Sequence, residues 1–265
     1  MHGQLMQGLI STIKDYKILE ECAEDAKHSI PKCPNTNSIQ IHWDRGEFDF
    51  SSLGQILNSF SSVLKAITDL AEIDYSMDIC FIPTKGLSVY EDKEKFCKLC
   101  EEGCANYARK WSCPPFAPHF TDYVLEWKKI FVFYLRIDLE QFSYIKNDYL
   151  KVKAANAILK SRSDKFLRKM AEKHGKYISS GSCRFCKPCK CKSGSPCAHP
   201  NVMTYSFEAM GIDVGQLVSN YFQKPLLWYK PQCPPKYTSV VCGLLTNEEL
   251  TVDDLYNEYS EHIIR

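Results

Sequence analysis

Residues 128–139 read KKIFVFYLRIDL, a run of aromatic, β-branched and leucine side chains with few polar residues. Such residues are enriched in β-strands, so this run predicts a strong strand. The segment DYLKVKAANAILKSRSDKFLRKMAEKHG (148–175) then predicts a long helix, which Gly175 ends. A strand followed by a long helix indicates a domain in which helices pack on a sheet.

Further elements lie on both sides of this pair. MDICFIP and GLSVY predict a strand pair over 77–90, KYISSGS (176–182) leads on from the long helix as a strand, and KYTSVVCGLL (236–245) predicts a last strand. Short helices are expected over 206–222, interrupted at 211–213, and a polar helix over 247–263. The expected fold is therefore α+β (or α/β), a small mixed sheet flanked by helices, with two cysteine-rich loops.

The N-terminal part has a different character. Residues 38–50, SIQIHWDRGEFDF, alternate apolar and polar positions around 44–46 and predict a hairpin. Apolar residues at three- and four-residue steps predict an amphipathic helix over 53–70, and a less regular pattern predicts one over 3–27. We expect two domains: an N-terminal hairpin and helix module over 1–75, with a possible interaction role, and a cysteine-rich metal-binding domain over 76–265.

Composition places the chain among ordinary globular proteins. It has 265 residues, 45% of them apolar and 25% charged, with a formal net charge of +1. Nothing in this balance indicates nucleic acid or an anionic membrane as a partner. No apolar run is long enough to span a bilayer, and the N-terminus does not resemble a signal peptide. We expect a cytoplasmic protein, in which the 14 cysteines serve metal or redox chemistry more often than disulfides.

Five of these cysteines fall in CRFCKPCKCKSGSPC (183–197). The spacing C-x2-C-x2-C with a distant fourth cysteine is the pattern of bacterial iron–sulfur proteins. Structural zinc sites instead combine two separated C-x2-C pairs. The spacing favours a 4Fe–4S cluster, with zinc as the alternative and a disulfide knot as the third interpretation. The expected ligands are Cys183, Cys186, Cys189 and Cys197. Cys191 lies between them, and His199 is expected to be an exposed loop histidine.

A second group of cysteines precedes the central strand. Cys97, Cys100, Cys104 and Cys113 lie in FCKLCEEGCANYARKWSCPP, a spacing that suits a metal loop but selects no metal. Proline follows Cys113, as it follows cysteine in ferredoxin loops. Cys233 repeats the cysteine–proline–proline unit and is a further candidate ligand.

The charge around the later group is one-sided. Residues 176–207 contain no acidic residue, whereas the basic ones are Lys176, Arg184, Lys187, Lys190, Lys192 and His199. Cations near a cluster stabilise its negative charge and raise its potential. The same loop would suit an acidic redox partner protein, and a solvated lysine-rich loop is the alternative.

Three motifs occur together in a recognisable order. They are C-x3-C-x-N-Y-x3-W-S-C-P-P-F at 100–116, C-x2-C-x2-C-x7-C-x-H-P at 183–200, and S-x-E-A-M-G-I-D-V at 206–214. Over residues from about 77 to 245 the chain resembles a family of predicted metal-binding proteins, domain of unknown function 2284. The resemblance implies metal ligands at Cys100, Cys104 and Cys113, with Cys97 as an optional fourth, and a second set at Cys183, Cys186, Cys189 and Cys197.

Three kinds of function remain open from the sequence. The first is a redox protein that holds one or two 4Fe–4S clusters and passes electrons to a partner. The second is an enzyme in which a cluster with three cysteine ligands activates a substrate or transfers sulfur at an open iron. The third is an interaction module stabilised by zinc. Catalytic residues are not indicated, because the chain carries no hydrolase triad, HExxH helix or phosphate loop.

Overall fold

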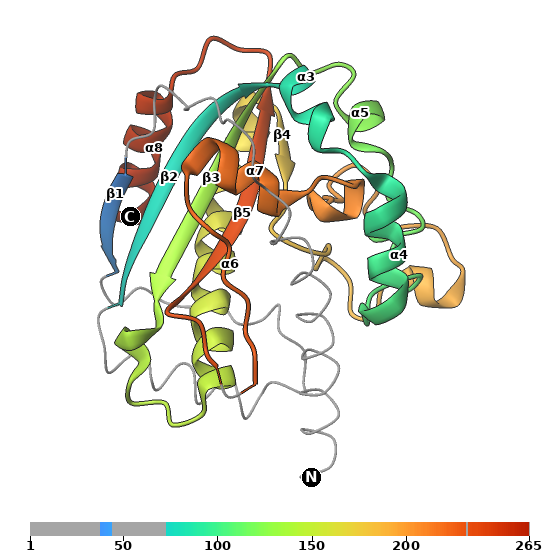
Figure 1. The fold of residues 1–265 in the computed structure, drawn as a ribbon. Helices are drawn as coiled ribbons and strands as arrows, with labels where there is room; N and C mark the ends of the chain where they lie inside the picture. Colours follow the sequence, from blue (N-terminus) through green and yellow to red (C-terminus); the bar gives the residue numbers. More distant parts are fainter. Residues whose placement is uncertain (1–37, 44–72, 232, 265) are drawn as a thin grey trace.

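The structure is a computed structural model that describes residues 38–43, 73–231 and 233–264. Its centre is a five-stranded sheet in the order β1-β2-β3-β5-β4, with every neighbouring pair antiparallel (Figure 1). The strands are β1 (Ser38–Trp43), β2 (Ile73–Pro83), β3 (Lys129–Asp138), β4 (Lys176–Ile178) and β5 (Tyr237–Thr246).

Strand β3 occupies the middle of the sheet because its side chains are apolar on both faces. Alternate residues point to opposite faces of a strand. Phe131 and Phe133 belong to one buried cluster and Ile130 and Val132 to the other. A strand buried on both faces needs a continuous apolar run, which β3 provides.

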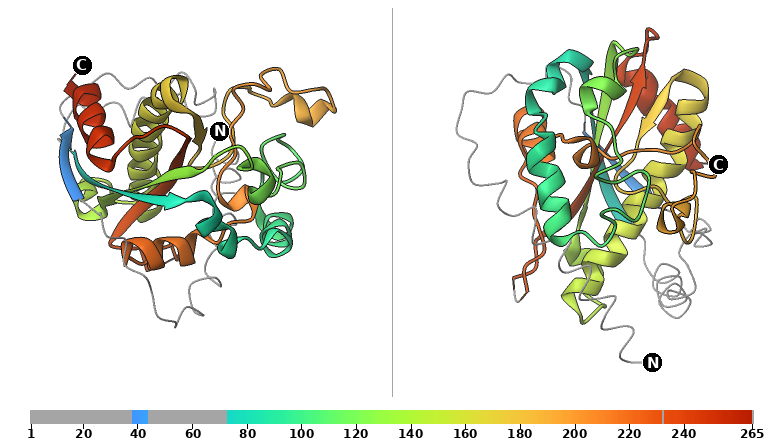
Figure 2. Two further views of the ribbon diagram at one scale, coloured as in Figure 1. Left: turned by 90° about the horizontal axis from the view of Figure 1, so that it is seen from above. Right: turned by 90° about the vertical axis from the view of Figure 1, so that its right-hand side faces the viewer.

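One layer of helices covers each face (Figure 2). The long helix α6 (Asp148–His174) and the C-terminal helix α8 (Val252–Ile264) pack on the first face. Helix α7 (Val214–Phe222) packs on the second. Asn147 caps α6 by accepting a hydrogen bond from the Leu150 N–H, and Gly175 follows its last residue. The result is a layer of helices on each side of an antiparallel sheet.

The remaining helices are short. They are α3 (Thr84–Leu87), α4 (Lys93–Gly103) and α5 (Phe120–Tyr123), together with the 3-10 helices η3 (Ser88–Tyr90), η4 (Leu139–Phe142), η5 (Lys190–Ser193) and η6 (Glu208–Met210). Figure 1 shows α4 and the loop that contains η5 side by side, away from β1 and α8. This end of the molecule carries both cysteine groups.

The α+β class expected from the sequence is confirmed, and so are the central strand, the long helix, the last strand and the helices of 206–222 and 247–263. The sheet is antiparallel rather than mixed. Residues 86–90 are helical, in α3 and η3, and not the expected second strand. The Thr84 N–H and hydroxyl donate to the carbonyls of Lys128 and Trp127 at 3.1 and 2.6 Å, which ends β2, and β2 pairs with β3 instead of a local partner.

The N-terminal expectations are only partly within the described residues. Residues 38–43 form a strand, and that strand extends the main sheet by pairing with β2. The other arm of the hairpin and the helices expected over 3–27 and 53–70 lie outside the described residues. The division at residue 75 stays a prediction. Among the described helices, none combines the length and apolar character needed to cross a membrane.

Candidate metal centre

Helix α4 positions the first cysteines. The Asp92 carboxylate caps its start by accepting from the Lys95 N–H at 3.0 Å. Cys97 and Cys100 are three residues apart, so they lie on neighbouring positions of the helix surface. The Cys104 N–H donates to the Cys100 carbonyl at 2.9 Å, and the backbone of Cys104 is extended, which ends the helix. The motif thus places two cysteines on one helix and a third where it stops.

The third sequence motif anchors α4. The Lys93 ammonium donates hydrogen bonds to the carbonyls of Ala117 at 2.8 Å, Pro118 at 3.1 Å and Ala209 at 2.6 Å. Gly211 has φ +97°, and a Cβ there would lie 2.7 Å from the Lys93 Cα. Only glycine accommodates both the left-handed backbone and this close approach. The segment 206–214 therefore acts as a support for the first cysteine group.

The fourth cysteine of the group is the most buried. Cys113 is 6% exposed and follows a series of turns in which the Ala108 N–H donates to the Pro114 carbonyl at 2.9 Å. Burial raises the pKa of the Cys113 thiol to about 12, and the neighbouring Cys104 thiol acts in the same direction. A buried thiol with another thiol beside it is a poor free nucleophile and a suitable metal ligand once deprotonated.

Three of the four cysteines share one environment. The hydrogen bond with the Cys104 thiol, followed by burial and the charge effects of Cys104 and Cys113, raises the pKa of Cys100 well above its ordinary value. Cys100, Cys104 and Cys113 all line the same cavity. Cys97 does not line it and lies beside the Tyr107 side chain. Cys97 thus differs from the other three in not lining the cavity, although it neighbours Cys100 on α4.

The second group is gathered on the loop between β4 and η6. Partial desolvation raises the pKa of Cys186, and the neighbouring thiols Cys189, Cys183 and Cys197 raise it further. The four cysteines expected to bind metal are therefore neighbours in space. Cys191 is buried and its thiol contacts the Ala108 carbonyl at 3.8 Å, on the first cysteine loop.

Hydrogen bonds join the two cysteine loops directly. The Lys110 ammonium donates to the Ser182 hydroxyl at 2.8 Å and to the Cys183 carbonyl at 3.0 Å. The Cys183 N–H donates to the buried Ser112 hydroxyl at 3.0 Å, and the Trp111 indole N–H donates to the Ser195 carbonyl at 2.9 Å. Consecutive residues of the first motif thus bind the second, and the two groups form one continuous region.

A cavity of about 310 Å³ adjoins the first group. Its walls come from α4, α6, η6, β5 and the segment after α7. Two ionisable side chains of opposite sign line it, Lys160 on α6 and Glu208 on η6. Burial lowers the pKa of Lys160 to about 8 and raises the pKa of Glu208. Both keep some accessible surface because they face the cavity.

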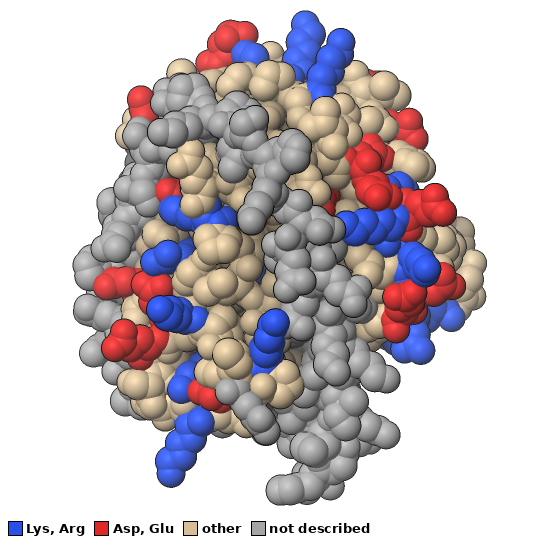
Figure 3. Space-filling model, in the orientation of Figure 1, with Lys and Arg blue, Asp and Glu red and all other residues tan. Residues whose placement is uncertain are grey.

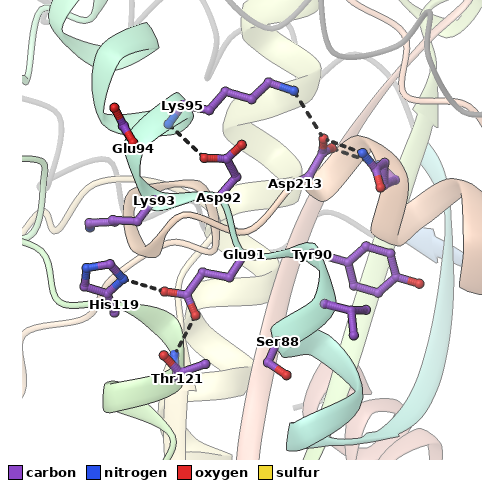
Figure 4. A pocket seen from close by; sticks show the side chains of 12 residues that line it. Ser88, Tyr90, Glu91, Asp92, Lys93, Glu94, Lys95, His119, Thr121 and Asp213 are labelled. Atoms are coloured by element: carbon purple, nitrogen blue, oxygen red, sulfur yellow. Dashed lines mark hydrogen bonds and ion pairs between the residues drawn. The ribbon is translucent and has the colours of Figure 1, made fainter.

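A second pocket, beside the start of α4, holds carboxylates with structural partners (Figure 4). Glu91 accepts hydrogen bonds from His119 Nδ1 at 2.8 Å and from the Thr121 N–H at 2.9 Å. Asp213 caps α7 by accepting from the Gln216 N–H at 3.0 Å. Of the two acidic residues in the third motif, Asp213 is thus a helix cap, and Glu208 faces the cavity.

The profile of one protein family matches this region. The description of that family is "Predicted metal-binding protein (DUF2284)", and the match covers residues 81–245, which is more than half of the chain. The chain belongs to this family. No curated protein and no solved structure showed a significant match. The DUF2284 region contains both cysteine groups, the anchoring motif and the cavity.

The structure places the predicted site residues of this DUF2284 chain in different surroundings. The four cysteines expected as the second ligand set are neighbours on one loop, and three of the first set line one cavity, but the role of these cysteines as metal ligands stays a prediction. His199 is exposed, as expected, with its ring 5.8 Å from that of Phe185. Cys233 is exposed on a turn before β5. Within the described residues, no three His, Cys, Asp or Glu side chains are close enough to hold a single metal ion.

Lys160 is a residue of the site that sequence reasoning missed. It lies on the predicted long helix. Polar residues interrupt the apolar pattern of that helix, and this interruption could have indicated a polar site on its buried side. Asn156, Lys160 and Ser163 recur at four- and three-residue steps, so they share one stripe of the helix. Asn156 and Lys160 line the cavity, and Ser163 is buried.

Proposed function

We propose that this member of the DUF2284 family is a cytoplasmic protein that holds 4Fe–4S clusters and takes part in electron transfer. The observation that carries the proposal is the gathering of Cys186 with Cys183, Cys189 and Cys197 on one loop. All nine cysteines of the two groups are free of disulfides. Free, clustered thiols in a reducing compartment favour metal or redox chemistry.

The donor set fits such a cluster. Thiolates are soft ligands that suit iron–sulfur clusters, and zinc is the alternative metal for them. The spacing of Cys183, Cys186 and Cys189 supports iron–sulfur over zinc. When bound, a cluster of this kind stores and passes on single electrons. The surrounding cations, among them Lys110 and Lys190, act on these thiols and would offset the negative charge of a cluster.

The first group supplies a second set of candidate ligands, Cys100, Cys104 and Cys113. Its loop is hydrogen-bonded to the loop of the second group, so two centres held there would be close neighbours. The resulting proximity would favour transfer of electrons between them.

One observation favours a second candidate function, catalysis at the first group. The three thiols that share an environment face a cavity, and Cys97 is placed apart from it. A cluster held by three cysteines leaves one metal position free to bind a substrate, where the metal acts as a Lewis acid. We propose this enzyme role, by substrate activation or sulfur transfer, as the alternative.

Electron transfer also requires a partner, and we propose that a redox protein docks on the loop of the second group. Lys187, Lys190 and Lys192 are exposed there, and no acidic residue occurs between 176 and 207. Over α4, in contrast, acidic and basic side chains alternate (Figure 3). An acidic surface on the partner would therefore be guided to the loop rather than to α4.

The test is to purify the protein without oxygen and to measure iron, zinc and acid-labile sulfide, together with the visible absorption spectrum. Iron and sulfide in equal amounts, about four of each for one cluster and about eight for two, support the proposal. Zinc in the absence of sulfide would reject it and favour a structural metal site.

A further inference from the structure

The cavity beside the first cysteine group contains one cation without a close partner. Within the described residues, the Lys160 ammonium donates no hydrogen bond, and no carboxylate lies within 4.0 Å of it. Its Nζ atom lies 3.8 Å from the position that a Cβ on Gly181 would take. Helix α6 therefore places a basic side chain against the cavity, without an ion-pair partner among the described residues.

Glu208, the acidic side chain that also lines the cavity, does not serve as the ion-pair partner of Lys160. Burial raises the pKa of the Glu208 carboxyl, and interactions with its own backbone and with the Ser206 side chain partly offset this rise. Glu208 affects Lys160 through charge, without forming an ion pair with it. Removing a cation from water without giving it a partner is costly, and this desolvation is the main reason that the pKa of Lys160 is lowered. An anion that enters the cavity would offset this cost.

The other residues that line the cavity indicate that such an anion would also have an apolar part. Phe96, Leu99, Val214, Leu226 and Val240 form an apolar wall. Sites for small molecules are mostly apolar, with a few polar groups that fix orientation, and have volumes of about 300–1,000 Å³. The cavity, at about 310 Å³, is at the small end of that range.

We propose that this cavity is a binding site for a small organic carboxylate, with the carboxylate on Lys160 and the apolar part against Leu226 and Val240. The bound molecule would lie against the thiols of Cys100 and Cys104. The site depends on Lys160 and on the shape of the cavity, and not on which metal the cysteines hold. It goes beyond the proposed function by giving the chain a ligand.

Titration of the purified full-length protein with benzoate, hexanoate and uncharged benzamide tests the site by calorimetry or by ligand-observed NMR. Lys160→Met removes the charge and keeps the length of the side chain. Lys165→Met is the matched control, because Lys165 is an exposed residue of the same helix. We expect saturable binding of the two carboxylates and a loss of affinity of about tenfold or more in Lys160→Met only. Benzamide binding should be weaker and equal in all three proteins.

The proposal is overturned if neither carboxylate binds, if Lys160→Met binds them as well as the control does, or if benzamide binds the natural protein as tightly as benzoate. If Lys160→Met does not fold, the comparison of benzoate with benzamide in the natural protein decides alone. Iron and sulfide are measured on the same samples. Carboxylate binding by a protein that contains no iron or sulfide would refute the proposed function and support the binding site. A protein that contains iron and sulfide but binds no carboxylate would support the proposed function and refute the binding site.

Discussion

The ammonium group of Lys110 donates a 3.0 Å hydrogen bond to the backbone carbonyl of Cys183 and thereby joins the two cysteine groups. Lys110 lies in the first motif and Cys183 begins the second, 73 residues later. Burial lowers the pKa of Lys110, whereas the neighbouring Cys113 and Cys183 raise it. The lysine is thus a positive charge placed between two sets of thiols.

The first prediction concerns this link. Lys110→Met removes the donor and keeps most of the apolar length, so the Cys183 carbonyl and the Ser182 hydroxyl lose their partner. We expect the free energy of unfolding to fall by about 1–3 kcal/mol in urea titrations. Lys98→Met, at an exposed position of α4, should have no measurable effect. Equal stability of the two variants would show that the link contributes nothing.

A second prediction concerns the support of α4. Gly211→Ala places a Cβ 2.7 Å from the Lys93 Cα at a residue with φ +97°, whereas Gly194, with φ +67°, has no atom within 4 Å of such a Cβ. Alanine at a left-handed position costs about 1–2 kcal/mol. The close contact should add about 1–3 kcal/mol in Gly211→Ala alone. Thermal and urea unfolding of both variants measures the difference. Similar losses in the two would mean that the backbone conformation alone requires glycine.

A third prediction is a pH dependence that originates in Lys160. The pKa of this side chain is lowered to about 8 in the folded protein from an ordinary value of 10.5, so above pH 8 the unfolded state binds more protons than the folded state. The contribution of Lys160 to stability therefore rises as the pH increases from about 8 towards 10.5. At pH 7 it is unfavourable, because a buried cation must be kept charged.

The comparison with Lys160→Met isolates this effect. The variant should be more stable than the natural protein at pH 7, and this advantage should shrink as the pH is raised through 8 and 9. Urea titrations at each pH, with Lys165→Met as the control, provide the measurement. If the stability advantage of Lys160→Met stays constant across this pH range, the pKa of Lys160 in the folded protein is not lowered to about 8.

A fourth prediction distinguishes the cysteines of α4. Cys100→Ala should lose the metal of the first group, because Cys100 shares the environment of Cys104 and Cys113. Cys97→Ala should keep it, because Cys97 lies beside Tyr107 and does not line the cavity. Iron per chain in the two purified variants decides the point. If Cys97→Ala loses as much iron as Cys100→Ala, the first group has four ligands and no open position.

Much of this fold could be predicted from residue patterns. The strand at 129–138 and the helix at 148–174 have long, regular patterns, and both occur as expected. The prediction of a strand at GLSVY (86–90) is wrong, because a short apolar run does not distinguish a strand from a helical turn. Strand β2 ends just before this run at Thr84, which is hydrogen-bonded to Trp127 and Lys128, more than 40 residues away in sequence.

The candidate site was predictable in its cysteines and not in its surroundings. The spacing of Cys183, Cys186 and Cys189 already indicated one metal centre. The pairing of the two cysteine loops depends on Lys110, Trp111 and Ser112, whose partners are 71 to 84 residues away in sequence. No local pattern shows such contacts. Lys160 belongs to the site because α6 and η6, which pack on opposite faces of the sheet, both reach the cavity, and this is a property of the tertiary fold alone.

The most direct test of the central claim is the iron and sulfide content of Cys186→Ala, purified without oxygen beside Cys233→Ala. Cys186 has the three other cysteines of its group as neighbours, and Cys233 is exposed on a separate turn. We predict that Cys186→Ala loses about four irons and four sulfides per chain, the content of one cluster, and that Cys233→Ala keeps the content of the natural protein. Full iron and sulfide in Cys186→Ala would contradict the assignment of this loop as a cluster site.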